Sequence, residues 1–160
     1  MLIISAPSRV GSKVHLISPS IFLAGSIDMG TAINWQKKVE EEFQYFPGII
    51  FNPRRDDWDS SWKQEDVDPQ FRAQVDWELD YLRYASKVFM FISKESKAPI
   101  TLLEFGYIAH SFPEKLTICV EDGFYRRGNI EVVCRREGIP LQNNLQTTID
   151  NLKIQMAAQL

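Results

Sequence analysis

The sequence lacks most features of a secreted, membrane-spanning or polyanion-binding protein. Its two cysteines, Cys119 and Cys134, lie far apart without CxxC spacing, which excludes a disulfide framework and indicates a reducing compartment. No apolar run approaches the roughly 20 residues that span a bilayer, and the first residues lack the basic start of a signal peptide. We therefore expect a cytoplasmic protein without a membrane partner.

Charge and histidine content argue against two further classes. The 160 residues carry 18 basic and 21 acidic side chains, for a net charge of −3, whereas nucleic-acid binders usually have a basic excess. The two histidines, His15 and His110, have no cysteine or histidine companion at metal-binding spacing. We expect neither a nucleic-acid partner nor a metal site.

Apolar runs alternate with longer segments of helical periodicity, a pattern typical of β-α-β units in a mainly parallel sheet. No repeat or linker divides the sequence, so residues 1–160 are expected to form one domain. The strands predicted from the apolar runs are 20–24, 49–52, 88–92, 116–120 and 130–134. The predicted helices are about 33–46, 69–84, 99–110 and from about 145 onward. Residues 1–18 fit either a strand or an extended arm. The pattern predicts the α/β class: a single three-layer, doubly wound, Rossmann-like domain with a mainly parallel five-stranded sheet.

Doubly wound sheets bind ligands at the carboxyl ends of their strands, where the strand order reverses. The segments after Ala24, Asn52 and Ile92 should therefore meet at one cleft. After the first of these strands, Gly25-Ser26 allows close backbone approach and supplies a hydroxyl group.

The loop after Asn52 is rich in hydrogen-bonding groups. Its Arg54, Asp57 and Trp58 could hold a nucleobase by polar edge contacts and stacking. An ordinary surface loop with salt bridges has the same composition, and spacing alone does not separate the two.

The segment Thr101-Leu102-Leu103-Glu104 has two interpretations. As a capping box, its threonine hydroxyl and glutamate carboxylate would each satisfy a backbone amide at a helix start. Alternatively, Glu104 in the first helical turn would be kept ionised by the helix dipole, as a nucleophile attacking an anomeric carbon requires.

Glu78 lies on the expected inward stripe of the second helix, seven residues after Phe71 and four before Leu82. A carboxylate there is unfavourable unless it has a partner or a task. It could form a buried ion pair with Arg54 or Arg55, or act in the cleft.

Four motifs then occur in order along the chain. They are Phe22-Leu23-Ala24-Gly25-Ser26-Ile27, Asn52-Pro53-Arg54-Arg55 with Asp57-Trp58, Gln74-Val75-Asp76-Trp77-Glu78-Leu79, and Pro99-Ile100-Thr101-Leu102-Leu103-Glu104-Phe105-Gly106. Together they resemble the nucleoside 2-deoxyribosyltransferase family, particularly its second, shorter-motif branch, over about residues 20–134. A related group, the 2'-deoxynucleoside 5'-monophosphate N-glycosidases, shares the Gly-Ser turn and the late Glu-Phe/Leu-Gly helix.

The resemblance implies a flavodoxin-like sheet and a double-displacement reaction that requires no metal or organic cofactor. The family's nucleophilic glutamate falls on Glu104, which would form a deoxyribosyl ester. Its paired acidic residue falls on Glu78, where several members have aspartate. Phe22 falls where some members have a tyrosine whose hydroxyl orients the nucleophile.

Members of the family complete each active site with a C-terminal segment of a neighbouring subunit. Gly128-Asn129-Ile130 resembles that segment, so Asn129 would bind the sugar hydroxyl. A homodimer or larger even assembly is therefore implied. The adjacent Arg126-Arg127 could instead bind a phosphate.

The expected function is transfer of 2-deoxyribose between nucleobases in nucleotide salvage, with a small nucleoside or nucleotide and a free nucleobase as partners. Glu104 and Glu78 are the expected catalytic residues. The expected substrate-binding residues are Phe22, Gly25, Ser26, Asn52, Arg54, Asp57, Trp58 and Asn129. Two alternatives are an N-glycosidase that hydrolyses deoxynucleoside monophosphates or a nicotinamide dinucleotide, and a nucleotide-binding module without turnover.

Overall fold

The computed structural model describes residues 1–9, 19–27, 34–55 and 63–159. Its elements in chain order are β1 (Leu2–Ser5), β2 (Ser20–Gly25), α1 (Trp35–Glu42), β3 (Ile49–Asn52), α2 (Pro69–Tyr84), β4 (Lys87–Ile92), α3 (Pro99–Ser111), the short 3-10 helix η2 (Pro113–Lys115), β5 (Leu116–Val120), α4 (Arg127–Glu137), β6 (Leu141–Gln142) and α5 (Leu145–Ala157).

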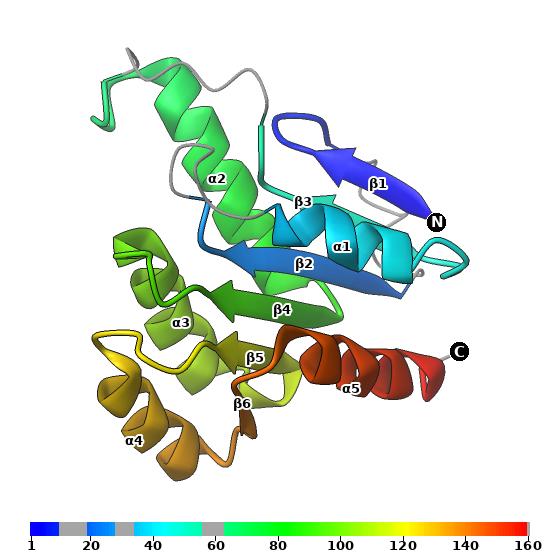
Figure 1. The fold of residues 1–160 in the computed structure, drawn as a ribbon. Coiled ribbons are helices and arrows are strands. Elements are labelled where there is room, and N and C mark those ends of the chain that lie inside the picture. Colours follow the sequence, from blue (N-terminus) through cyan, green and yellow to red (C-terminus); the bar gives the residue numbers. More distant parts are fainter. Residues whose placement is uncertain (10–18, 28–33, 56–62, 160) are drawn as a thin grey trace.

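The strands form one parallel sheet in the order β1-β3-β2-β4-β5-β6 (Figure 1). The α/β, doubly wound class expected from the sequence is thus confirmed. The sheet has six strands instead of five, because two further strands, Leu2–Ser5 and Leu141–Gln142, form its edges and one expected strand, 130–134, is absent. Leu2–Ser5 pairs with β3, so this part of residues 1–18, for which both a strand and an extended arm were possible, is a strand.

The strand expected over 130–134 is wrong, because these residues lie in helix α4. Ile130 and Cys134, four residues apart, are both buried, whereas Val132 between them is 45% exposed. That spacing matches one face of a helix and not the alternation of a strand. Gly138 ends the helix in the left-handed conformation at φ 71°, and the sixth strand, β6, follows it.

Two hydrophobic clusters cover the two faces of the sheet. On one face, α1 and α5 pack on Ile21, Leu23 and Phe89. On the other, α2, α3 and α4 pack on the alternate residues, among them Phe22 and Met90. Figure 1 shows the three layers that result. The central strands β2, β4 and β5 are almost entirely buried, as expected for parallel strands covered on both sides.

Local sequence explains the start of α2, whose bounds agree with the predicted 69–84. Asp68 is the N-cap and accepts hydrogen bonds from the backbone N–H groups of Gln70 and Phe71, at 2.9 and 3.0 Å, while Pro69 occupies the first turn. These hydrogen bonds lower the pKa of Asp68, and the bond from the Phe71 N–H has the largest effect.

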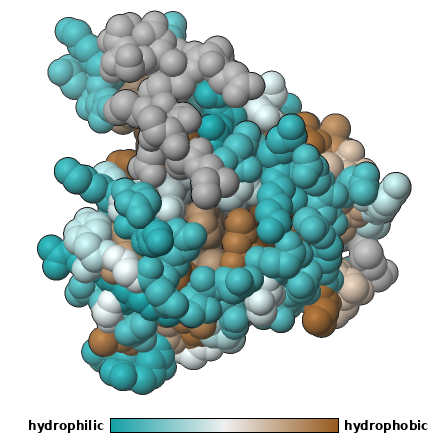
Figure 2. Space-filling view, viewed as in Figure 1, coloured by the Kyte–Doolittle hydropathy of each residue, from teal (hydrophilic) through white to brown (hydrophobic). Residues whose placement is uncertain are grey.

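Hydrophilic residues cover most of the face seen in Figure 2, and hydrophobic ones appear there in smaller patches. Among the helices that the structure describes, none combines the length and the apolar character needed to cross a membrane. Cys119 and Cys134 are both buried and unpaired. Burial raises the pKa of the Cys134 thiol to about 11.

The strand order reverses between β2 and β4. From β2 the chain passes through α1 to β3 on one side, and from β4 it passes through α3 to β5 on the other, with the two helices on opposite faces of the sheet. The carboxyl ends of β2 and β4 are therefore the switch point at which such folds bind ligands.

Candidate active site

Gly25 and Ser26 join the ends of β2 and β4 at the switch point. Gly25 has φ +146°, and a Cβ there would lie 2.2 Å from the Phe91 carbonyl oxygen, so only glycine fits. The Ser26 N–H donates to that same oxygen at 3.0 Å, and the Ser26 hydroxyl accepts from the Ser93 N–H at 3.2 Å. The backbone at Gly25 and Ser26 therefore lies close to the end of β4, and the hydrogen bonds of Ser26 hold the two strand ends together.

The end of β3 is fixed by Asn52. Its side-chain amide donates to Glu40 at 2.8 Å, and its carbonyl oxygen accepts from the Arg54 N–H at 2.9 Å. The Arg54 guanidinium then reaches Gln36 Oε1 at 3.4 Å, which turns Arg54 toward α1. Asp57 and Trp58, the other predicted residues of this loop, lie outside the described residues.

Gln36, in the first turn of α1, is fully buried. Its Nε2 has no hydrogen-bond partner within the described part of the chain. A buried amide without a partner is uncommon, and the sequence offered no signal for it because Gln36 lies next to a run of charged residues.

Glu78 lies on the inner side of α2, as predicted, although the buried stripe differs from the expected one. The buried residues of α2 are Gln74, Trp77, Tyr81 and Leu82, while Phe71 and Val75 are partly exposed. Glu78 accepts a 2.7 Å hydrogen bond from Gln74 Nε2. Within the ranges that the structure describes, no arginine forms an ion pair with Glu78. Burial raises the pKa of Glu78, and the bond from Gln74 opposes that effect.

Glu104 is buried, with 8% of its surface exposed, in the second turn of α3. The helix begins at Pro99 after Ala98, which has φ 45° and ψ 46°, and no side chain caps it. The capping-box interpretation is therefore wrong, and so is the expected first-turn position. Within the described residues, the Glu104 carboxyl has no hydrogen-bond or ion-pair partner.

The electrostatics of Glu104 also differ from expectation. Burial, and after it the charge of Glu78, raises the pKa of Glu104 from 4.5 to about 8. The expected stabilisation of its ionised form by the helix dipole is thus outweighed, because desolvation and a like charge both favour the neutral acid. At neutral pH the two carboxyl groups together retain a proton.

This carboxyl pair combines two chemical abilities at one place. A protonated carboxyl group can donate a proton to a departing group, and a carboxylate can act as a nucleophile. Carboxyl groups whose pKa values are raised by burial or by a neighbouring carboxylate are concentrated at functional sites. The pair on α2 and α3 is therefore the centre of the candidate active site.

The structure also shows the surroundings of three other predicted residues. Phe22 is fully buried beneath Trp77, with ring centroids 6.1 Å apart, so it can influence a ligand only through the residues that cover it. Asn129 is exposed in the first turn of α4. Arg127 forms ion pairs with Asp122 and Glu131, which occupy its guanidinium group.

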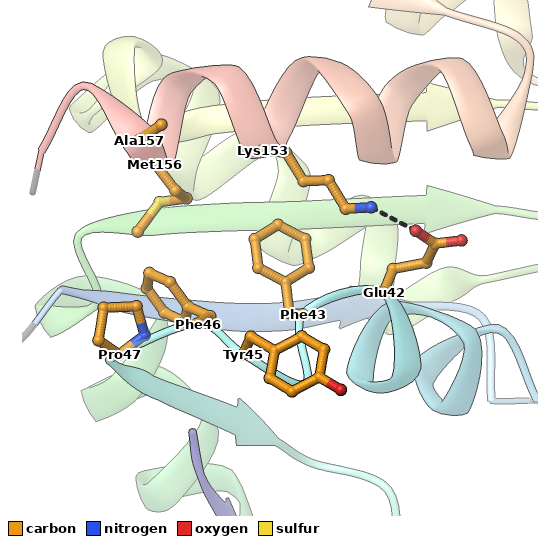
Figure 3. Close-up of a pocket in the computed structure, with 8 residues that line it drawn as sticks. All are labelled: Glu42, Phe43, Tyr45, Phe46, Pro47, Lys153, Met156 and Ala157. Atoms are coloured by element: carbon orange, nitrogen blue, oxygen red, sulfur yellow. Dashed lines mark hydrogen bonds and ion pairs between the residues drawn. The ribbon is translucent and has the colours of Figure 1, made fainter.

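A surface groove of about 220 Å³ lies at the opposite edge of the sheet (Figure 3). It is formed by the chain between α1 and β3, including Phe46 and Pro47, and by the end of α5, and the Lys153–Glu42 ion pair lies along it. Because Phe46 and Pro47 precede β3 whereas Asn52 ends it, the groove is at the amino ends of the strands. It is separate from the carboxyl pair. Within the described ranges, no group of three or more histidine, cysteine or acidic side chains is arranged to hold a metal ion.

The chain is thus an α/β protein of the doubly wound class, in which ligands bind at the carboxyl ends of the parallel strands. The family model described as "Nucleoside 2-deoxyribosyltransferase like" matches residues 18–124, well over half of the chain. The chain therefore belongs to this nucleoside 2-deoxyribosyltransferase-like family, as the sequence motifs predicted. The matched range includes Glu78 and Glu104 and ends before Asn129. No curated protein matched the chain.

Proposed function

We propose that this protein transfers 2-deoxyribose from one nucleobase to another through a covalent ester on Glu104. The observation that carries this proposal is the Glu104 carboxyl itself, which is buried, has no partner among the described residues, and lies within the electrostatic reach of Glu78. A buried acid without a structural partner is unfavourable for folding, so a catalytic task accounts for its presence.

In the first half of the reaction, the proton held by the pair passes to the departing base through Glu78. A carboxylate oxygen of Glu104 forms a bond to C1' as the C1'–N bond breaks, and the electron pair of that bond stays on the base nitrogen that receives the proton. The developing positive charge on the sugar is stabilised by the Glu104 carboxylate. The products are a free base and a deoxyribosyl ester.

The second half reverses these steps with another base. Its ring nitrogen attacks C1', the ester bond breaks, and its N–H proton returns to the carboxyl pair. Water in place of the base would release free 2-deoxyribose, which is hydrolysis instead of transfer. Both outcomes use the same Glu104 ester, so the products distinguish them.

The test is incubation with deoxyadenosine and free cytosine, with separation of deoxycytidine from free sugar. Trapping with a 2-fluoro-substituted arabinosyl nucleoside should add one sugar mass to a peptide containing Glu104. The folded Glu104→Ala variant should lose essentially all turnover and all label, whereas a Glu41→Gln variant, altered at an exposed glutamate near the C-terminal end of α1, should keep both. Full activity of Glu104→Ala would exclude Glu104 as the nucleophile. Free sugar without deoxycytidine would make the protein a hydrolase.

A further inference from the structure

Gln74 is the buried polar residue of α2 that the mechanism above does not use. Only 3% of its surface is exposed, and it lies one helical turn before Glu78. Its Nε2 donates to Glu78 Oε1 at 2.7 Å and to the Pro53 carbonyl oxygen at 3.2 Å. Its Oε1 accepts from Arg55 Nη1 at 3.4 Å. Every polar atom of this side chain is thus engaged.

These contacts fix which end of the amide faces Glu78. The Oε1 atom is turned to the Arg55 guanidinium, and both Nε2 contacts are with acceptors. An amide nitrogen can donate to a carboxylate but cannot accept a proton from a carboxylic acid. The bond therefore favours the ionised form of Glu78 over its protonated form.

The charged groups around this bond come from two neighbouring segments. The charge of Glu78 raises the pKa of Glu104 on α3, and Arg55, in the segment after β3, contacts Gln74. On α2 itself, Asp80 forms an ion pair with Arg9 on a more exposed side. Glu104 has no hydrogen-bond donor of its own among the described residues, whereas Glu78 has Gln74. The ionised form is therefore favoured on Glu78 over Glu104.

We propose that Gln74 is a positioning residue that holds Glu78 ionised and thereby keeps the shared proton on Glu104 in the unliganded protein. Its catalytic meaning rests on the proposed function: the nucleophile stays neutral until a ligand accepts the proton. Pro53 and Arg55 hold the amide in place, so the segment after β3 and the carboxyl pair are mechanically linked through Gln74.

The experiment is a carboxyl-carbon NMR titration of the unliganded protein with ¹³C-labelled glutamate. The Glu104 and Glu78 signals are assigned with Glu104→Gln and Glu78→Gln. In the wild type, the titration step near pH 8 should appear chiefly on Glu104. In Gln74→Met, which has similar length and no donor, the ratio of protonated Glu104 to protonated Glu78 should fall about tenfold or more, since a hydrogen bond to a charged group is lost.

Gln74→Asn provides a second test, because it keeps an amide but withdraws it from Glu78, and it should shift the ratio in the same direction. A folded variant of either kind with a ratio within threefold of the wild type would overturn the inference. The upper limb of the kcat/KM pH profile should also move to higher pH in both variants. The titration requires no turnover, so its outcome is separate from that of the trapping experiment. A shifted proton with an active Glu104→Ala would refute the proposed function alone.

Discussion

Replacing Glu104 by glutamine should stabilise the protein, and the gain should grow with pH. The folded protein holds a proton on Glu104 up to about pH 8, whereas an ordinary glutamate loses it near 4.5. Below pH 4.5 this carboxyl group is protonated in both the folded and the unfolded state, so its ionisation does not change the free energy of unfolding. Between these pH values the unfolded chain releases a proton that the folded protein keeps, so the wild type loses stability as pH rises.

The size of the effect follows from the raised pKa. Each pH unit in this window lowers the free energy of unfolding by about 1.4 kcal/mol, and the loss levels off above pH 8 at about 5 kcal/mol. Glutamine has nearly the same shape and no charge, so Glu104→Gln should show none of this loss. The difference between the two proteins should be small at pH 4.5 and several kcal/mol at pH 8.5.

Urea denaturation at pH 4.5, 6.5 and 8.5 measures this difference directly. Glu95→Gln is the matched control, since Glu95 is exposed and its replacement should leave stability within about 0.5 kcal/mol at every pH. An equal gain for Glu104→Gln at pH 4.5 and 8.5 would mean that Glu104 ionises normally in the folded protein. The argument from burial and from the charge of Glu78 would then be wrong.

Three further predictions test other parts of the site. Glu78→Gln should keep or raise stability at pH 8 in a melting experiment, because it removes a charge that raises the pKa of Glu104. Its steady-state turnover should fall about a hundredfold or more. A variant that is less stable but equally fast would show that Glu78 takes no part in the mechanism. In Gly25→Ala the free energy of unfolding should fall by about 3 kcal/mol or more, or the protein should fail to fold, since the new Cβ would lie 2.2 Å from a backbone oxygen of β4. Gly128→Ala is the control: its Cβ would lie in open space, so it should melt at or above the wild-type temperature. Sedimentation should show a dimer or larger assembly, and mixing inactive Glu104→Ala with inactive Asn129→Ala should restore some activity; an active monomer would contradict the shared-site hypothesis.

The sequence predicts the fold well where local pattern and burial agree. The bounds of α2 follow from Asp68, Pro69 and the apolar spacing, and the apolar run of β4 is recognisable because parallel strands are covered on both faces. The prediction of a strand over 130–134 was wrong because a short run of β-branched residues has strand propensity. Burial of Ile130 and Cys134 against α3 instead favours a helix.

The motifs singled out two acidic residues that the structure buries, but the electrostatics of these residues could not be predicted from the sequence. The motifs located Glu78 and Glu104, and the family match covers both. The protonation of Glu104 depends on burial and on a neighbour from another helix, which spacing along α3 does not encode. The proposed role of Gln74 depends on contacts with Pro53 and Glu78, and the charged residues next to Gln36 in the sequence give no sign of its burial.

The position of α5 in the chain has a consequence for synthesis on the ribosome. This last helix contributes Ile149, Leu152 and Met156 to the cluster that also contains Ile21 and Trp35, and Lys153 forms an ion pair with Glu42, 111 residues earlier. Domains emerge from the ribosome starting with the N-terminus, and uncovered apolar faces at that stage favour aggregation. The face of β5 on which α5 packs therefore remains incompletely covered until the chain has been translated through Met156. Until α5 has been synthesised, this apolar surface favours self-association of the nascent chain.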